Sequence, residues 1–364
     1  MRILHLINHC QYGNGSVHVA VDLACVQAEL GHAVMCASGG GDYLELMDEY
    51  GVRCETLVQK QKNPLKLMGS LATLMKICRS FKPDIIHAHM MAGAVFGKFA
   101  SVVFRIPLVT TVHNSFDTHS FLMRLGDKVV AVSNAERDLL IERGYDSKKV
   151  VAVLNGSNRS PRDNHFETMD SSVLESIRKP FITTVCGLHF RKGVHDLIAG
   201  FAEIASVHRD WNLYVVGEGP DKGTLIELAK RLNLADRVVF LGYVKNPQPI
   251  LNKADIFTLA SYAEPCGLVV GEAREAGCAI VGTAVGGTPE MLEFGHAGLL
   301  VDPKSPKEIA AALDKLMSDP VVLETMRANS KRGSEYYRVA RVVDDYLKVY
   351  ASLTSRADGS RANL

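Results

Sequence analysis

Two glutamates, Glu264 and Glu272, lie eight positions apart in the segment ASYAEPCGLVVGEAREAGC. Pro265 and Gly267 break the chain after the first, and residues 268–276 then have the pattern of a short amphipathic helix. Because a helix start exposes unpaired N–H groups and a partial positive charge, it favours phosphate. A carboxylate before that start and one inside the helix could hold hydroxyl groups on two sides of a diphosphate, as in a nucleotide-sugar. Two solvated glutamates around a helix start are the simpler interpretation.

A pair of cations, Arg191 and Lys192, follows the apolar run 181–185 and precedes Gly193. At the carboxyl end of a parallel strand, two cations suit a diphosphate leaving group whose negative charge grows as a glycosidic bond breaks. A solvated cation pair at a turn is common, so this pattern gains meaning only together with the other motifs.

Glycine-rich turns follow several expected strands. Gly13-Asn14-Gly15 leaves the first strand and enters a helix, where a doubly wound fold places a phosphate-binding turn. His18 stands where a dinucleotide fingerprint has its third glycine, which argues against a dehydrogenase. The turn that begins at Gly217 could line the nucleotide, and the turn that ends at Glu290 could contact the sugar. Both could also be ordinary loops.

A histidine, His113, ends an apolar strand and should project from its carboxyl tip. It could contact a sugar or accept a proton, while a buried, hydrogen-bonded histidine is the alternative. His87 and His89 are two apart, but no third metal ligand is evident and the sequence has no Asp-x-Asp. We therefore expect no metal and no cofactor, with the cations and helix starts holding the diphosphate.

Short β-rich runs alternate with helical patterns along almost the whole chain, which is typical of parallel sheets built from β-α-β units. The expected strands of the first half are 2–7, 33–37, 53–57, 84–87, 108–112, 128–132 and 150–154. Those of the second half are 181–185, 212–216, 238–241, 256–258 and 279–281, before a helical tail from 305 to about 353. We predict two Rossmann-like halves whose carboxyl strand ends face each other across a cleft.

The composition excludes several classes of protein. The 364 residues are 47% hydrophobic with a formal charge of +1, so no global field favours nucleic acid or membrane. The eight cysteines include no C-x-x-C pair, which fits a reducing compartment. The apolar stretch 90–104 contains Lys98 and is too short to span a bilayer, and the N-terminus does not resemble a signal peptide. We expect a cytoplasmic protein whose oligomeric state is open.

The residues resemble glycosyltransferase family 4, a family of retaining enzymes with the GT-B fold, over most of the chain. The motifs that carry the resemblance are Gly13–Gly15, His-Ala-His after Asp84, Thr-Val-His at 111–113, Ala-Val-Ser at 131–133, Arg191-Lys192-Gly193, Gly217–Pro220, Phe240–Val244, Glu264-x7-Glu272 and Gly286–Glu290. Each is loose alone, and together in this order they are specific. The resemblance implies an N-terminal acceptor-side domain (1–156), a linker (157–179), a C-terminal donor-side domain (180–334), a helix that returns to the first domain (335–353) and a flexible tail (354–364).

The resemblance also implies roles for individual residues. Glu272 would hold the ribose hydroxyls, Glu264 would face the donor sugar, and His113 would sit beside the transferred sugar. The implied catalytic residues are Glu264, His113, Arg191 and Lys192. The implied donor-binding residues are Glu272, Gly13, Gly15, Gly217, Tyr243, Val244, Gly267, Leu268, Val269 and Glu290.

Two positions depart from the family. Leu188 stands directly after Gly187, where the family usually has arginine, and Cys266 stands between the glutamates where phenylalanine is common. The first departure puts the role of Arg191 in doubt, and the second suggests a changed pocket wall.

These observations predict a metal-independent retaining transferase that moves a sugar from a UDP- or GDP-sugar to an acceptor hydroxyl in polysaccharide, lipopolysaccharide or glycolipid synthesis. A GT-B enzyme of the sucrose- or glycogen-synthesising kind and a non-catalytic nucleotide-sugar-binding subunit are the alternatives. The segment 60–79 has cations beside an apolar stripe. Peripheral contact with a membrane, to reach a lipid-linked glycan, and an ordinary half-buried helix both explain it.

Overall fold

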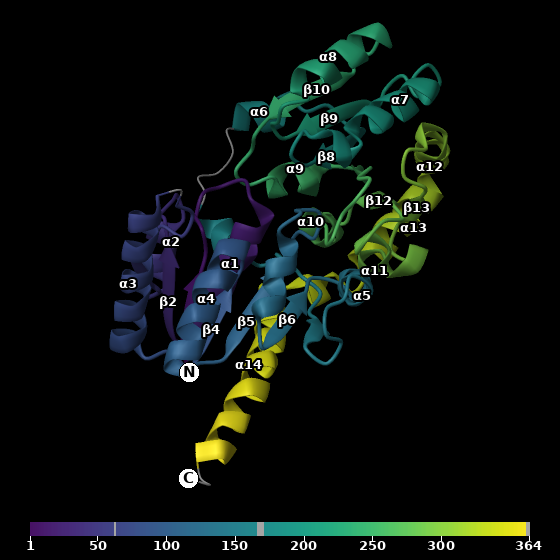
Figure 1. The fold of residues 1–364 in the computed structure, drawn as a ribbon. Coiled ribbons are helices and arrows are strands. Elements are labelled where there is room, and N and C mark those ends of the chain that lie inside the picture. Colours follow the sequence, from purple (N-terminus) through teal and green to yellow (C-terminus); the bar gives the residue numbers. More distant parts are fainter. Residues whose placement is uncertain (62, 166–170, 362–364) are drawn as a thin grey trace. The chain divides into compact units, whose positions relative to one another are not determined.

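The computed structural model describes residues 1–61, 63–165 and 171–361. Contacts divide the chain into two compact units (Figure 1). Unit 1 is Met1–His165 with Tyr337–Leu364, and unit 2 is Phe166–Tyr336. Within the described residues, no helix combines the length and the apolarity that a bilayer crossing requires.

Unit 1 is built around a parallel sheet of seven strands in the order β3-β2-β1-β4-β5-β6-β7. The strands are β1 (Arg2–Leu6), β2 (Ala33–Ser38), β3 (Arg53–Thr56), β4 (Ile85–Ala88), β5 (Leu108–Val112), β6 (Lys128–Ala131) and β7 (Val150–Ala152). The helices are α1 (Gly15–Glu29), α2 (Leu44–Glu49), α3 (Pro64–Phe81), α4 (Met91–Phe104), α5 (Asn134–Glu142) and α14 (Val339–Arg361), with the 3-10 turns η1 (Ser120–Leu125) and η2 (Pro161–Asn164). All seven strands expected in the first half are present.

The chain after β7 stays attached to unit 1. Arg162 donates two hydrogen bonds, of 2.8 and 3.0 Å, to the carboxylate of Asp22 on α1, and both side chains are buried. Ser160 adds a bond of 2.7 Å to the same carboxylate. The predicted linker therefore starts too early, because residues 157–165 are fixed to α1 by a buried ion pair that a polar composition conceals.

Helix α14 packs against α1 within unit 1. The chain enters it through Tyr337, whose carbonyl accepts from Asn158 N–H at 3.0 Å. Gly156 lies so close to the backbone of Tyr337 that a side chain would collide with it. The helix continues to Arg361, beyond the end at about 353 that the sequence predicts.

Unit 2 contains a parallel sheet of six strands in the order β10-β9-β8-β11-β12-β13. The strands are β8 (Phe181–Val185), β9 (Asn212–Val216), β10 (Val238–Gly242), β11 (Ile256–Leu259), β12 (Ala279–Thr283) and β13 (Leu299–Val301). The helices are α6 (Ser171–Ser176), α7 (Val194–Ile204), α8 (Lys222–Arg231), α9 (Gln248–Lys253), α10 (Leu268–Ala276), α11 (Thr288–Met291), α12 (Pro306–Ser318) and α13 (Pro320–Lys331), with the 3-10 turns η3 (Phe190–Lys192), η4 (Glu293–Gly295) and η5 (Ser334–Tyr337). Five of the six strands were expected, and β13 was missed because three residues carry no readable period.

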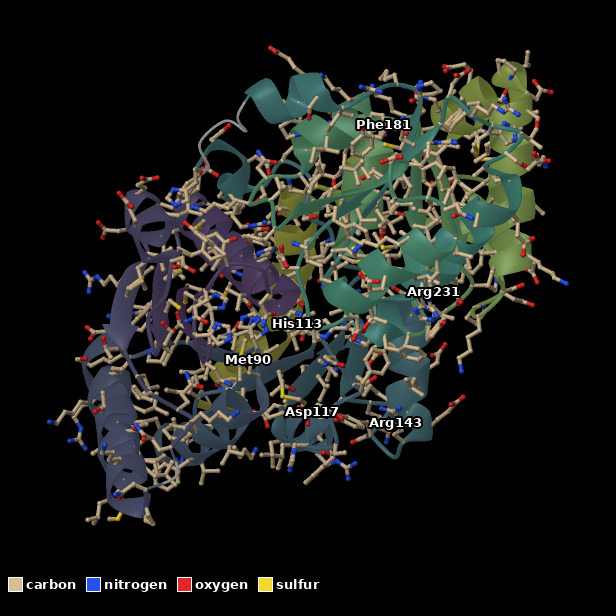
Figure 2. The ribbon with its side chains drawn as sticks, turned by 90° about the horizontal axis from the view of Figure 1, so that it is seen from above. Met90, His113, Asp117, Arg143, Phe181 and Arg231 are labelled. Carbon is tan, nitrogen blue, oxygen red and sulfur yellow. The ribbon has the colours of Figure 1, made fainter. Side chains whose placement is uncertain are left out.

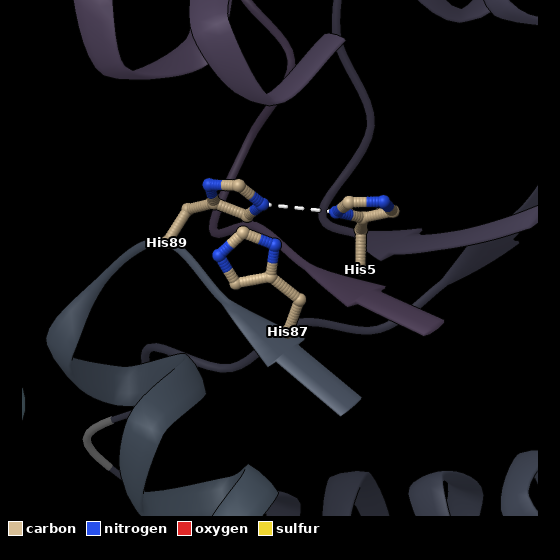
Figure 3. Close-up of side chains that lie close together, drawn as sticks. All are labelled: His5, His87 and His89. Atoms are coloured by element: carbon tan, nitrogen blue, oxygen red, sulfur yellow. Dashed lines mark hydrogen bonds between the residues drawn. The ribbon is translucent and has the colours of Figure 1, made fainter. Parts of the chain in front are cut away.

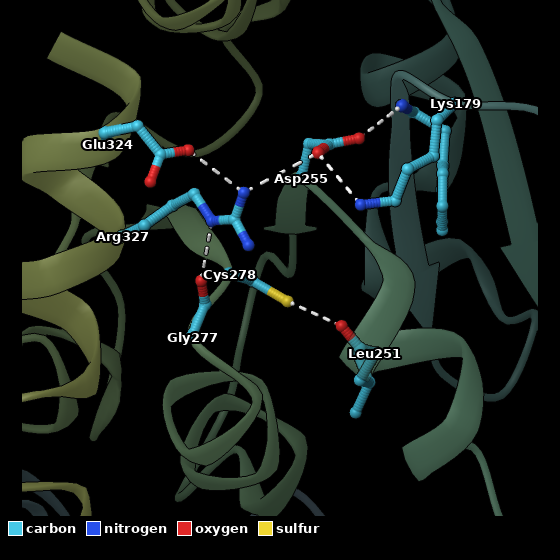
Figure 4. A network of polar contacts seen from close by, with 8 residues as sticks. Lys179, Leu251, Asp255, Gly277, Cys278, Glu324 and Arg327 are labelled. Carbon is cyan, nitrogen blue, oxygen red and sulfur yellow. Dashed lines mark hydrogen bonds and ion pairs between the residues drawn. The ribbon is translucent and has the colours of Figure 1, made fainter. Parts of the chain in front are cut away.

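A polar network fixes the amino ends of β8 and β11 (Figure 4). Asp255 accepts from the backbone N–H of Phe181 at 2.9 Å and lies 3.5 Å from Lys179 and 3.7 Å from Arg327. The two strands are thereby held in register at one edge of the sheet. Their carboxyl ends, at the opposite edge, lead into η3 and into the loop before α10, so this edge carries the candidate site.

Candidate functional site

The cationic turn and the loop before α10 meet in unit 2. Nζ of Lys192, in η3, lies 2.5 Å from Oε2 of Glu264. The side chains are 14% and 8% exposed. The sequence predicts separate ligand groups for these two residues, and the structure brings them together as one nearly buried ion pair.

The backbone joins the same two segments. Tyr262 N–H donates to the carbonyl of Arg191 at 2.7 Å, and the guanidinium of Arg191 donates to the carbonyl of Ala263 at 3.3 Å. Gly193 has a φ of +64° and lies directly against the carbonyl of Ala260, so no side chain fits there. The glycine of the Arg-Lys-Gly motif therefore serves the approach of the two loops.

Glu264 is held by the turn that follows β12. Gly287 N–H donates to the carbonyl of Glu264 at 3.0 Å, and Gly286, with a φ of +50°, packs on that carbonyl. Ser261 donates to Oε2 of Glu264 at 3.2 Å, and Thr283 donates to the carbonyl of Ser261 at 2.5 Å. These hydrogen bonds fix the turn at 285–290 to the loop that carries Glu264.

The pair keeps bonding capacity for a ligand. A lysine ammonium has three N–H donors, and within the described part of the chain Lys192 uses one of them, to Glu264. Both side-chain contacts of Glu264 engage Oε2, and among the described residues none engages Oε1. One polar edge of the pair can thus donate to phosphate oxygens while the other accepts from hydroxyl groups.

Helix α10 begins four residues after Glu264. Its N-cap is Gly267, and no side chain caps it among the described residues. The first helical residues, Leu268 and Val269, are half-buried, and Glu272 is half-buried one turn later. The start of α10 therefore presents backbone N–H groups beside the ion pair, with a second carboxylate on the same helix.

Arg274 anchors α10 from its buried side. The guanidinium donates to the carbonyls of Ser330, Met291 and Arg332 at 2.8, 2.7 and 2.6 Å, and to Glu293 at 2.5 Å. The side chain is 0% exposed. This position was not singled out from the sequence, because an arginine beside Glu272 reads as one more solvated charge.

The other predicted donor-binding residues of unit 2 differ in their exposure and packing. Tyr243 follows β10 directly and is 46% exposed, with Val244 half-buried beside it. Glu290 lies in α11 and is half-buried. Gly217 has a φ of +137°, donates to the carbonyl of Gly242 at 2.7 Å and packs on the backbone of Cys186, so the packing of the turn alone explains this glycine.

Leu188 explains one departure from the family pattern. It is 0% exposed and belongs to the hydrophobic core of unit 2. Its N–H donates to the carbonyl of Glu218 at 2.8 Å, and its carbonyl accepts from Asp221 N–H at 3.1 Å. Since this side chain points into the core, the cations of this turn are Arg191, which is exposed, and Lys192.

Tyr262 supports the site and was missed in the sequence. Its hydroxyl donates to Asp196 on α7 at 2.7 Å and lies 2.5 Å from Nε2 of His195. Burial is the largest cause that raises the pKa of Tyr262, followed by its bond to the Asp196 carboxylate. In the sequence, Tyr262 is visible only as an aromatic residue two positions before Glu264, and such a pattern is not specific.

In unit 1, the glycine-rich turn opens α1. Gly13 has a φ of +75°, and Gly15 is the first residue of the helix; both are exposed. The side chain of Asn14 caps the helix by accepting from Ser16 N–H at 3.0 Å. The turn therefore has the strand-to-helix placement that the sequence predicted, although one of the helix N–H groups is already occupied by the cap.

His113 follows β5 directly and is half-buried. His113 and Met90, which follow neighbouring strands, lie close together at the carboxyl edge of this sheet (Figure 2). Nε2 of His113 lies 3.2 Å from Nδ1 of His89, and burial lowers the pKa of His113 to about 3. His113 thus lies at the strand tip and is hydrogen-bonded, and its contact with a sugar stays a prediction.

Three buried histidines, His5, His87 and His89, could in principle hold a metal ion (Figure 3). One nitrogen from each lies within 4.8 Å of the others. All six of their ring nitrogens, however, already have hydrogen-bond partners at 2.7–3.2 Å. A metal would have to break several of these bonds, so the donor set fits a hydrogen-bonded cluster better than a metal centre.

Known protein families match both halves of the chain. Residues 166–334 match the family described as Glycosyl transferases group 1, and residues 13–160 match Glycosyltransferase Family 4. The chain belongs to glycosyltransferase family 4. The enzyme is 27% identical over 361 residues to N-acetyl-alpha-D-glucosaminyl L-malate synthase of Bacillus anthracis, covering 92% of this chain and 93% of that protein.

Solved structures confirm the GT-B fold of this glycosyltransferase. Anabaena Alr3699/HepE in complex with UDP and glucose has a TM-score of 0.82 at 22% identity, covering 97% of this chain and 100% of that one. Sucrose-phosphate synthase from Thermosynechococcus elongatus has a TM-score of 0.78 at 20% identity, covering 98% and 100%. The family uses nucleotide-sugars and retains the configuration of the transferred sugar, as the resemblance of the motifs implied.

Proposed function

We propose that unit 2 binds the nucleotide-sugar donor around the Lys192–Glu264 pair and the start of α10. The single observation that supports this most is the 2.5 Å pair, nearly buried beside the start of a helix whose N-cap, Gly267, has no side chain to cap it. Lys192 and the N–H groups of Leu268 and Val269 hold the diphosphate, and Glu272 accepts from the ribose hydroxyls. Glu264 accepts from hydroxyl groups of the sugar.

Arg191, exposed at the same turn, adds positive charge toward the diphosphate, and Tyr243 with Val244 lines the base. Glu290 contributes a further acceptor for the sugar. From unit 1, the resemblance assigns His113 to the transferred sugar and Gly13 and Gly15 to the diphosphate. These assignments rest on the family motifs, and Gly217 keeps only its role in the turn.

The reaction breaks the bond between the anomeric carbon and the diphosphate oxygen and forms a bond from that carbon to the acceptor oxygen on the same face. The proton of the acceptor hydroxyl goes to the departing phosphate oxygen. Lys192 stabilises the charge that develops on the diphosphate, so that its contribution is greatest in the transition state. Glu264 orients the sugar and, through its ion pair, holds the ammonium in place.

For the donor, we propose a UDP-sugar over a GDP-sugar. Its support is the structural relative solved with UDP-glucose, which is 22% identical to this chain. For the acceptor, we propose a hydroxyl of a growing cell-surface polysaccharide, a lipopolysaccharide or a glycolipid. The N-terminal part of α3 exposes Leu65 (78%) and Met68 (66%) beside Lys66, which supports peripheral contact with an anionic, glycolipid-bearing surface.

The test is donor binding and turnover by the purified protein. Isothermal titration against UDP, GDP and a panel of their sugars should give one preferred base, and the preferred donor should release nucleotide in the presence or absence of an acceptor. Lys192→Ala should abolish release, and Glu272→Ala should weaken nucleotide binding. Lys230→Ala, which removes a surface lysine paired to Glu227, is the matched control. Binding of no nucleotide by the folded chain, or full turnover by Lys192→Ala, contradicts the proposal.

A further inference from the structure

A buried chain of hydrogen bonds in unit 1 runs inward from His113 to α1. His113 Nε2 lies 3.2 Å from Nδ1 of His89, and Nε2 of His89 lies 2.9 Å from Nδ1 of His5. Nε2 of His5 lies 2.8 Å from Oε1 of Gln27. His5, His89 and Gln27 are 0–2% exposed, so water has no ready access to these contacts.

The chain continues from Gln27 to α14 and returns to the sheet. Nε2 of Gln27 lies 3.4 Å from the hydroxyl of Tyr350, which lies 2.7 Å from Nδ1 of His87. Nε2 of His87 lies 2.7 Å from the hydroxyl of Thr111, which in turn lies 3.1 Å from the hydroxyl of Tyr346. Three strands (β1, β4 and β5) and two helices (α1 and α14) thus share one polar core.

The Gln27 amide gives this chain a direction, because its oxygen can only accept and its nitrogen can only donate. His5 must therefore donate from Nε2, and its Nδ1 must accept. His89 then donates from Nε2 to His5 and accepts at Nδ1, so that His113 must donate from Nε2. Each step follows from the previous one, since a neutral imidazole carries one proton.

The second arm follows by the same count. The nitrogen of Gln27 donates to the hydroxyl oxygen of Tyr350, and among the described residues Nδ1 of His87 is the acceptor for the Tyr350 proton. His87 then donates from Nε2 to Thr111, whose hydroxyl lies 3.1 Å from that of Tyr346. All four histidines accordingly share the Nε2–H tautomer, and a reversed Gln27 amide would turn all four into the Nδ1–H tautomer.

Burial keeps the four rings neutral, as this count requires. It lowers the pKa of His5 to about 4 and that of His113 to about 3, and it lowers the pKa of His87 and His89 well below the ordinary value. Inside such a network a second proton on any ring would place two donors face to face. The neutral, alternating arrangement is therefore the one that satisfies every bond.

We propose that this chain fixes His113 in the Nε2–H tautomer, so that its Nδ1 is an obligatory acceptor. Gln27 and Tyr350, both distant from His113 in sequence, are then positioning residues that act on His113 along the hydrogen-bonded path. A ligand that meets Nδ1 must donate to it, as a sugar hydroxyl does, and a group that can only accept is rejected. The identity of the ligand as a sugar rests on the proposed function, whereas the tautomer does not.

The test is long-range proton–nitrogen NMR on the full chain with ¹⁵N-labelled histidine at neutral pH. The signals of His5, His87, His89 and His113 are assigned by single substitution of each. We expect a protonated Nε2 and an unprotonated Nδ1 in all four. An Nδ1–H tautomer or an imidazolium at His113 overturns the proposal, whether or not the protein binds any nucleotide.

A Gln27→Met variant removes the group that sets the direction. His113 should then show averaged nitrogen signals of both tautomers, and kcat/KM should fall about tenfold, the size of one neutral hydrogen bond, while affinity for free UDP stays unchanged. Gln248→Glu, on a surface amide that bonds Asn252, is the control and should alter neither readout. A single Nε2–H tautomer at His113 in folded Gln27→Met contradicts the proposal. If that variant does not fold, the measurement on the unmodified chain decides.

Discussion

Nζ of Lys192 lies 2.5 Å from Oε2 of Glu264, although 72 positions separate the two residues in sequence. Their side chains are 14% and 8% exposed, so each charge is largely removed from water. Burial of an ion pair costs desolvation, and loss of one partner leaves the other charge uncompensated. The pair therefore adds little net stability, but it fixes the loops that carry Lys192 and Glu264 to each other.

Lys192→Met should lower the free energy of unfolding by about 3–5 kcal/mol, because it leaves a buried carboxylate unpaired. The double variant Lys192→Met with Glu264→Leu should recover most of that loss, since it removes both charges. Neither variant should transfer sugar. Urea unfolding followed by circular dichroism measures the first effect, and nucleotide release measures the second.

The matched control is Lys230→Met, whose partner Glu227 is 64% exposed, and it should change stability by no more than about 0.5 kcal/mol. If the double variant were as unstable as Lys192→Met, desolvation would not be the cause. If it transferred sugar, the pair would have no part in catalysis.

Gly286→Ala should disturb Glu264 without touching its side chain. Gly286 has a φ of +50° and its Cβ would collide with the Glu264 carbonyl, so the turn must open. We expect a loss of about 1–3 kcal/mol of stability and a larger KM for the donor. Gly223→Ala on α8, where a Cβ meets nothing within 4 Å, is the control and should be neutral or stabilising. An equal donor KM in Gly286→Ala and the unmodified enzyme would show that the contact of this turn with Glu264 is not needed for donor binding.

The sequence predicted most of the fold because strands in parallel sheets are apolar on both faces and stand out between helices. It missed β13, whose three residues have no period, and it took residues 157–165 for a linker because the Asp22–Arg162 pair joins positions 140 apart. Of the candidate site, it predicted the residue types and their order along the chain, and their roles stay predictions.

The sequence could not reveal how those residues are combined. The Lys192–Glu264 pair, the Gly287 bond to Glu264 and the path from His113 to Tyr350 all join distant segments. The sequence alone does not specify such contacts, because they depend on which strand ends are neighbours in the sheet. His5 was passed over for the same reason, since one histidine in an apolar strand has no visible partner.

Leu188→Arg restores the arginine that the family usually has, and it should harm this enzyme. Leu188 is wholly buried in the core of unit 2, so a guanidinium there would have to displace apolar neighbours or unfold the turn. We expect a loss of more than about 3 kcal/mol and no gain in turnover. Thermal unfolding checks the stability, and nucleotide release checks the activity. A stable, faster Leu188→Arg enzyme would show that this turn can carry the family arginine after all.

Arg274→Lys should not behave as a conservative change. The guanidinium donates to three carbonyls and to Glu293 in directions that one ammonium cannot reproduce. We expect at least about 2 kcal/mol of destabilisation and weaker nucleotide binding, because α10 carries Glu272. Calorimetry and titration with UDP measure the two. Arg231→Lys, on the last turn of α8, is the control. An unchanged UDP affinity in Arg274→Lys would show that the hydrogen bonds of Arg274 do not support the donor site.

The buried histidines should make unit 1 sensitive to acid. Burial lowers the pKa of His5 from 6.5 to about 4, so the folded state binds fewer protons than the unfolded state between these values. The stability from this group is complete above about pH 6.5 and is lost as pH falls toward 4. From His5 alone we expect a decrease of roughly 2 kcal/mol between pH 7 and pH 5.

His87, His89 and His113 change the slope in the same direction, because burial lowers the pKa of each. The groups that face this cluster are Gln27, Thr111, Tyr346 and Tyr350, and none of them carries a charge at these pH values. Denaturant unfolding at a series of pH values measures the slope. His5→Gln should be less stable at pH 7 but should lose less between pH 7 and pH 5. The same slope in both proteins would mean that folding does not lower the pKa of His5, and the neutral network would then be wrong.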